Sequence, residues 1–309
     1  MLACAACALG TASCGGGGGG SGGGPPPVTG NITLSGRITF DRPSRTANHT
    51  LNFGMLQRMP ARGVTVDVLR SSDLAVLATA TADTNGSYAL NFNSTNFILR
   101  ARAQIQRASP GSYNLEVRDN TTGGALYVLD SAAITPTGNT MTVDLNAATG
   151  WNGAAFTGTR SAAVFAILDV AWMAQNLIHQ AEAGRDMPAL DFFWSTLNRA
   201  EDPVGACASQ PNPDTGEIGT SFFLAFSFPA LGGCPAVPAG IYILGDASGN
   251  LNDDPDEYDG SVIAHEFGHY YEFFFSRSDS VGGPHSWAIT EPSYSSGSSF
   301  RLPLASPRM

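Results

Sequence analysis

The sequence predicts a multidomain protein in which an all-β antiparallel sandwich precedes an α+β domain. Apolar and polar residues alternate from residue 30 to about 147, which is the period of half-buried strands. Beyond Gly150 the apolar period becomes helical, and a second apolar helix carries the pattern His-Glu-x-x-His. The expected segments are a signal-like stretch, a tether, the sandwich, the α+β domain and an irregular tail, at 1–14, 15–29, 30–147, 148–286 and 287–309.

At least six short strands, separated by turns rich in Gly, Asn, Asp and Pro, build the predicted sandwich. In the strand at 99–105, odd-numbered apolar residues face one way and even-numbered polar residues face the other. The expected strands lie around 38–40, 64–68, 88–92, 99–105, 113–117 and 141–145.

Three stretches of this half resemble a carboxypeptidase-regulatory-like domain. They are Ser-Gly-Arg-Ile-Thr-Phe at 35–40, Ala-Arg-Gly-Val-Thr-Val-Asp-Val at 61–68 and Thr-Ala-Asp-Thr-Asn-Gly-Ser-Tyr-Ala-Leu at 81–90. The resemblance covers about residues 33–105 and implies a stabilising or substrate-presenting module without chemistry of its own. It also carries the alternative function, a non-enzymatic cell-surface binding or structural lipoprotein in which the sandwich binds a partner or glycan.

The second half begins with a helix pattern at 161–183. Ser161 is the expected cap and Gly184 the expected end, and the helix is apolar enough to be mostly buried. Short apolar runs at 190–194, 221–228 and 241–244 predict strands. His179, near the end of this helix, is interpreted as a partly buried residue without a role in chemistry.

The last helix, which begins near Asp259 or Ser261, carries the candidate metal site. Two His residues four apart lie one turn above each other, so His265 and His269 can reach one Zn²⁺. Glu266 lies beside them and can act as the base for a water that the metal activates. The alternative is a solvated helix with two surface His residues.

A helical wheel tests this placement, since each residue advances by about 100°. It separates an apolar face from a ligand face. Glu272 shares the ligand face, and its expected role is to orient a histidine ligand without binding the metal itself. Gly268 is expected where another backbone approaches closely. The apolar face carries Ile263, Phe267, Tyr270 and Phe274, and the ligand face His265, His269 and Glu272.

The stretch from Asp256 to Glu272, with residues 275–286 after it, resembles a zincin metallopeptidase of the gluzincin type. The resemblance implies zinc-dependent hydrolysis of a peptide or protein substrate. Its third ligand, a Glu in a Gly-Glu-Gly-like stretch, is absent, which leaves activity in doubt. The third zinc ligand is therefore Glu291, His285 or Asp279, or it is missing. We interpret residues 287–309 as out-of-frame translation and the second domain as incomplete.

Six acidic residues crowd the loop before this helix. Their spacing partly mimics an EF-hand, with Asp246 first and Glu257 twelfth, although Leu251 replaces the required Gly. Ca²⁺ binding is one expectation, a solvated acidic loop is the other, and Asp259 is the expected cap of the helix. The six residues are Asp246, Asp253, Asp254, Asp256, Glu257 and Asp259.

The first 14 residues resemble the end of a bacterial lipoprotein signal, with Thr-Ala-Ser-Cys14 in the lipobox position and a Gly/Ser/Pro tether after it. This implies an exported protein of the bacterial cell envelope, lipid-anchored at Cys14, with Cys4 and Cys7 as alternatives. A Gly-rich tail without this role is the other interpretation. No other 18-residue apolar stretch occurs, so a lipid anchor is the only membrane contact predicted.

Two cysteines remain beyond the leader, Cys207 and Cys234. An even pair in an exported protein favours a disulfide, which would contribute roughly 3 kcal/mol.

The charge balance argues against a nucleic-acid partner. There are 16 basic and 26 acidic residues, every basic residue is Arg, and no basic block occurs. A hydrophobic content of 43% excludes wholesale disorder.

Overall fold

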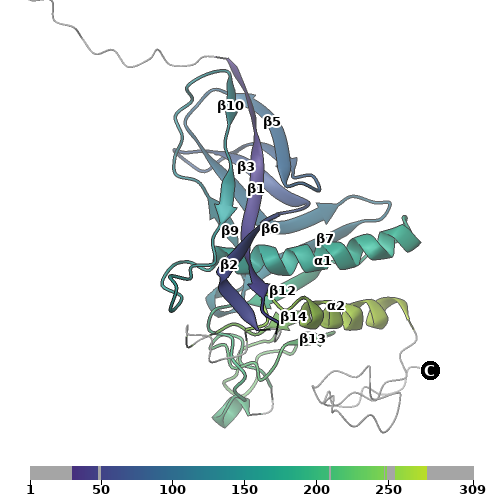
Figure 1. Ribbon diagram of the computed structural model, residues 1–309. Helices are drawn as coiled ribbons and strands as arrows, with labels where there is room; N and C mark the ends of the chain where they lie inside the picture. Colours follow the sequence, from purple (N-terminus) through teal and green to yellow (C-terminus); the bar gives the residue numbers. More distant parts are fainter. Residues whose placement is uncertain (1–29, 48–49, 209, 247, 249–254, 277–309) are drawn as a thin grey trace, which may run out of the picture.

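The computed structural model describes residues 30–47, 50–208, 210–246, 248 and 255–276, and within them the protein is mostly β, with two sheets that form a sandwich-like arrangement (Figure 1). The smaller sheet contains β1 (Asn31–Arg45), β2 (Leu51–Pro60), β5 (Ser87–Asn93), β10 (Thr140–Thr142) and β11 (Leu145–Ala147). The larger contains β3 (Val64–Arg70), β4 (Val76–Thr81), β6 (Phe97–Arg107), β7 (Tyr113–Asp119), β8 (Ala125–Leu126), β9 (Val128–Asp130), β12 (Leu190–Trp194), β13 (Phe222–Leu224) and β14 (Gly240–Ile243).

Strand β1 organises the smaller sheet. It pairs antiparallel with β2 and β5 and parallel with β10 and β11. A tight turn leads into β5, where the Asp83 carboxylate accepts hydrogen bonds from the backbone of Asn85 and Ser87, each 2.8 Å long. Gly86 has φ +74°, and a Cβ there would lie 2.3 Å from the carbonyl oxygen of Ile38, so this turn requires glycine.

Five of the six strands that the periodicity predicted in the sandwich are present, the strand expected around 141–145 is instead the two short strands β10 and β11, and the predicted facing in β6 is confirmed. Leu99, Ala101, Ala103 and Ile105 are fully buried, whereas Arg100 and Arg102 point to the partly exposed face. Strands β2, β4, β8 and β9 were not predicted, because their apolar alternation is weak.

The larger sheet continues across the boundary expected at residue 147. Its order is β13-β14-β12-β7-β6-β3-β4, and β12 pairs parallel with β7. Parallel neighbours need a long crossover, and α1 (Ser161–Ala181) supplies much of it. One apolar core accordingly contains residues of both halves, among them Val66, Phe165, Ile241 and Phe267.

Helix α1 is the element around which the two halves pack. It contacts β1, β6, β7 and the second helix, α2 (Gly260–Phe275), which lies beside it (Figure 1). By length and composition α1 could cross a membrane, but 61% of its most apolar window is buried inside the protein. The expected Ser161 cap was wrong: Arg160 occupies the cap position, and the Ser161 hydroxyl instead contacts the backbone of Ala148.

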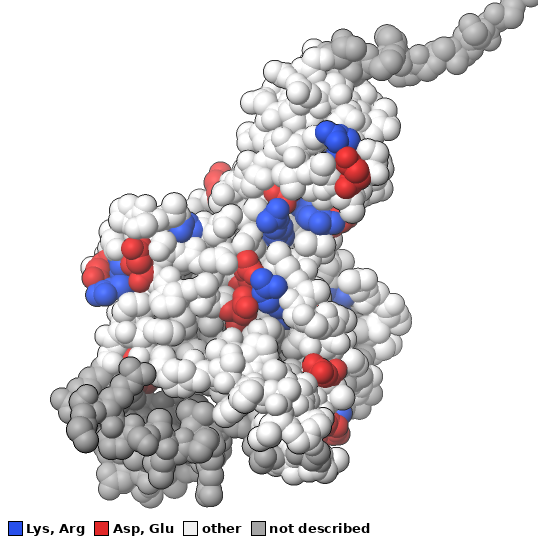
Figure 2. Space-filling view, turned by 180° about the vertical axis from the view of Figure 1, so that it is seen from behind, with Lys and Arg blue, Asp and Glu red and all other residues white. Residues whose placement is uncertain are grey.

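Arginines are paired with acids within and between the sheets, and in Figure 2 most blue side chains touch red ones. The carboxylate of Asp169 on α1, 1% exposed, lies 3.0 Å from Arg62 and 3.9 Å from Arg42. Arg42 also donates to the carbonyl of Tyr258, just before α2. These contacts join β1 to both helices.

Cys207 and Cys234 form a disulfide, as the cysteine count favoured. Cys207 closes a short 3-10 helix, Gly205–Cys207, and Cys234 lies in the connection between β13 and β14. Four sites named from the sequence, Cys14, Asp279, His285 and Glu291, lie outside the described residues, as do Asp253 and Asp254 of the acidic loop.

Candidate metal centre

An N-terminal cap and a buried apolar face fix the position of helix α2. The Asp259 carboxylate accepts hydrogen bonds from the backbone of Ser261 and Val262, so the predicted cap is confirmed. Ile263, Phe267 and Tyr270 are buried as the wheel predicted, and the Tyr270 hydroxyl donates to the carbonyl of Pro188 at 2.6 Å. Phe274 lies against Tyr270 on the same face, with ring centres 5.3 Å apart, but it is 43% exposed and not buried.

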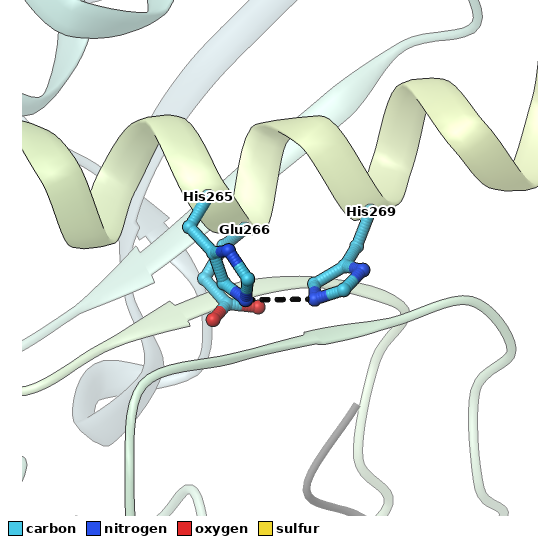
Figure 3. A group of neighbouring side chains, drawn as sticks. All are labelled: His265, Glu266 and His269. Carbon is cyan, nitrogen blue, oxygen red and sulfur yellow. Dashed lines mark hydrogen bonds between the residues drawn. The ribbon is translucent and has the colours of Figure 1, made fainter. Parts of the chain in front are cut away.

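His265, Glu266 and His269 project from the same side of α2 (Figure 3). The two histidine Nε2 atoms are 3.0 Å apart and the rings are nearly perpendicular, at 83°. On the far side of its ring, the Nδ1 atom of His269 lies 3.7 Å from the Glu272 carboxylate. This distance is too long for a hydrogen bond, so the orienting role expected for Glu272 stays a prediction.

Glu266 is the most deeply buried member of the group, 7% exposed. Burial raises its pKa to about 7; a hydrogen bond from the backbone N–H of Phe223 opposes this shift, and the nearby Asp256 carboxylate adds to it. Phe223 belongs to β13, so the carboxylate is held between α2 and this strand. The wheel had not anticipated this contact, because it describes one helix and not its neighbours.

Asp256, one of the six acids expected in a calcium-binding or solvated loop, is instead a buried residue of this region. It is 7% exposed and accepts a 2.6 Å hydrogen bond from the Ser221 hydroxyl, which in turn accepts one from the backbone N–H of Leu244. The backbone of Asp256 also donates to the carbonyl of Leu244. This network ties the segment before α2 to the ends of β13 and β14.

Glu257, the expected twelfth ligand of an EF-hand-like loop, is fully buried in an ion pair with Arg160. The Arg160 guanidinium also donates to the carbonyl of Asp246 and lies 4.0 Å from the centre of the Phe156 ring. The buried ion pair of Glu257 does not fit the role of a twelfth calcium ligand, because the spacing carries no information about burial, while Ca²⁺ binding by the rest of the loop stays a prediction.

The expectation for Gly268 finds no support in the part of the chain that the structure describes. Among the described residues, no atom lies within 4 Å of the position that a Cβ would take there. A close approach by the described backbone therefore does not explain this glycine.

His265, Glu266 and His269 make up the one group of potential metal ligands found among the described residues, with all ligand atoms within 4.8 Å of one another. Tetrahedral zinc with bonds of 2.0–2.1 Å places two nitrogens about 3.3 Å apart. The observed 3.0 Å is close to that separation, so the imidazole pair fits a zinc ion. His179 lies elsewhere, hydrogen-bonded to Gln175 and to the carbonyl of Arg185.

The chain matches no protein-family model and no curated protein. Solved structures match part of it, each at low similarity. A Pseudomonas aeruginosa protein described as a candidate carbohydrate binder shares 10% identity over 38% of this chain and 89% of its own, with a TM-score of 0.23. A 9R-lipoxygenase from Cyanothece shares 10% over 53% and 27%, with a TM-score of 0.23. The plantain pollen allergen Pla l 1 shares 16% over 38% and 92%, with a TM-score of 0.20.

Proposed function

We propose that the protein is a zinc-dependent peptidase whose metal is held by His265 and His269. The observation that carries the proposal is the imidazole pair with a buried carboxylate beside it, all on one side of α2. Bound zinc would act as a Lewis acid and lower the pKa of a water to about 7. The zincin resemblance of residues 256–286 points the same way.

The chain's own residues supply the remaining chemistry. Glu266 would take the proton from the attacking water and return it to the amine of the leaving group. Its buried position beside the imidazole pair keeps the carboxylate close to the water that it would deprotonate. Glu272 would hold the His269 ring in the orientation that binds metal.

The neighbourhood of β13 suits a peptide substrate. Among the described strands β13 stands at the edge of its sheet, with β14 as its one neighbour, and it contacts α2. An extended peptide that adds to a sheet edge gains main-chain hydrogen bonds, although the Phe223 N–H of this strand already donates to Glu266. Peptide-bond hydrolysis is therefore the reaction that we favour for this site.

We also propose that the protein is exported and lipid-anchored through Cys14. The disulfide between Cys207 and Cys234 supports export, because such bonds persist in oxidising compartments.

Metal titration of the metal-free protein tests the site. We expect one zinc per chain, lost in His265→Ala and retained in His179→Ala, a control histidine outside the site. With two protein ligands the affinity should be well below that of a three-ligand site. Tight binding would instead call for a third ligand, to be sought by alanine substitution at Asp279, His285 and Glu291.

Hydrolysis of casein by the zinc-loaded protein tests catalysis separately. Glu266→Gln should reduce the rate about 10²- to 10⁴-fold and leave zinc binding intact. If His265→Ala and Glu266→Gln change neither metal content nor hydrolysis, the enzyme proposal is wrong and the non-enzymatic binding role becomes the better one.

A further inference from the structure

Three phenylalanines form an aromatic patch beside the metal centre: Phe223, Phe226 and Phe273. The rings of Phe226 and Phe273 meet edge to face, with centres 5.1 Å apart, and the Phe223 ring lies 6.2 Å from that of Phe273. Phe223 is buried, but Phe226 is 51% and Phe273 41% exposed. Two large aromatic rings thus remain partly exposed next to a buried one, and the Phe273 ring also meets that of Phe274, with centres 4.9 Å apart.

The aromatic patch belongs to the same side of α2 as the histidines. Phe273 follows His269 by four residues, so the two side chains are neighbours on the helix, about 6 Å apart along its axis. By the same wheel Phe273 falls about 40° from His269, toward Glu266 and away from Phe274. The patch therefore continues the row that His265 and His269 begin.

Phe223 connects the patch to the carboxylate directly. Its backbone N–H donates to Glu266, while its ring packs against Tyr270, with ring centres 6.0 Å apart, and against Phe273. A group bound on the patch would therefore contact Phe223 of β13, the residue whose backbone N–H donates to the Glu266 carboxylate.

We propose that the aromatic patch binds a large apolar side chain of the peptide substrate, so that cleavage favours sites near aromatic or long aliphatic residues. This inference rests on the proposed peptidase function. Exposed aromatic rings gain free energy when an apolar group covers them, and stacked or edge-to-face rings add to that gain. Because the patch adjoins the histidines of the proposed metal site, we expect the peptide substrate to be the molecule that covers it.

The spacing sets where that side chain stands. Side chains on one face of an extended peptide repeat every two residues, or about 6.6 Å. This repeat matches the step of about 6 Å along α2 from His269 to Phe273. We therefore expect the preferred residue within two positions of the cleaved bond.

Peptide binding to the zinc-loaded Glu266→Gln protein, which should not cleave its ligand, tests the proposal by calorimetry. The probes are acetyl-Ala-Ala-Phe-Ala-amide and its Asp counterpart, short enough to shift register until the side chain meets the patch. We expect the Phe peptide to bind at least about tenfold more tightly. Adding Phe273→Ala or Phe226→Ala should bring the ratio close to one, whereas Val128→Ala, which shortens an equally exposed apolar side chain on β9, should leave it unchanged.

Equal affinities, no binding of either peptide, or a preference that survives both patch substitutions would overturn the proposal. So would a change in oligomeric state caused by Phe273→Ala, since the patch would then lie between copies of the chain. A Phe preference that depends on the patch, in a native zinc-loaded protein that cleaves nothing, would contradict the peptidase function and leave the patch assignment standing. Circular dichroism should show each variant folded, since both substituted rings are partly exposed.

Discussion

Arg45 at the end of β1 forms a 3.2 Å ion pair with Asp259, the residue that caps the helix of the metal centre. Arg42, three residues earlier, donates to the carbonyl of Tyr258 beside it. The first strand of the sandwich therefore contacts the start of α2 directly. Since both charges of the Arg45–Asp259 pair are partly exposed, the cap should contribute more stability than the ion pair.

Asp259→Ala should lower the free energy of unfolding by about 1 kcal/mol, because two backbone N–H groups of α2 lose their acceptor. Arg45→Ala, the control that removes only the ion pair, should cost less than about 0.5 kcal/mol. Urea unfolding of the metal-free proteins measures both. Equal losses would show that the ion pair, and not the cap, holds this end of the helix.

The same cap predicts a pH dependence. Partial burial works to raise the pKa of Asp259, but hydrogen bonds from Ser261 and Val262 and the charge of Arg45 outweigh it, so the pKa lies below its usual 3.8. A lowered pKa in the folded state stabilises the protein above pH 3.8, and this contribution is lost as the pH falls through the folded value. The difference between wild type and Asp259→Ala should therefore be full at neutral pH and shrink in strong acid. A difference that grows on acidification would contradict this sign.

Gly268→Ala should stabilise the protein by up to about 1 kcal/mol. The residue lies inside α2, where Ala is the better helix former, and no described atom stands where its Cβ would go. Thermal unfolding of the metal-free protein measures the change. Destabilisation would mean that part of the chain approaches Gly268 after all.

Arg160→Met should cost about 3–5 kcal/mol, because it leaves the carboxylate of Glu257 buried without its partner. Removing both charges, in Arg160→Met with Glu257→Leu, should recover much of that loss. Denaturant unfolding of the single and double variants tests the coupling. Equal stability of the two would show that the pair is not what makes the single substitution costly.

Cys207→Ser with Cys234→Ser should lower the stability of the oxidised protein by about 3 kcal/mol, since the bond closes a long loop of the unfolded chain. A reducing agent should destabilise wild type to a similar extent and leave the double variant unchanged. No effect of the reductant on wild type would contradict the bonded state.

The sequence by itself determined most of the local structure. Period-two alternation located β3, β5, β6 and β7, and helical period located α1 and α2, because a half-buried strand or helix must place apolar side chains at fixed intervals. The spacing of His265 and His269 brought their rings together for the same reason, since one helical turn is enough to make them neighbours.

Only the tertiary structure decided what surrounds that helix. Pairing of β7 with β12 joins the two predicted domains into one sheet. The sequence does not show this pairing, because strands connected by a long crossover leave no local sequence pattern. Burial assigned Glu257 to Arg160 and placed Phe223 against Glu266, although neither pair is close in sequence. Side-chain spacing along one element can be derived from helix and strand geometry. Contacts between elements depend instead on how their apolar faces pack into one core, and on which polar groups that packing buries together.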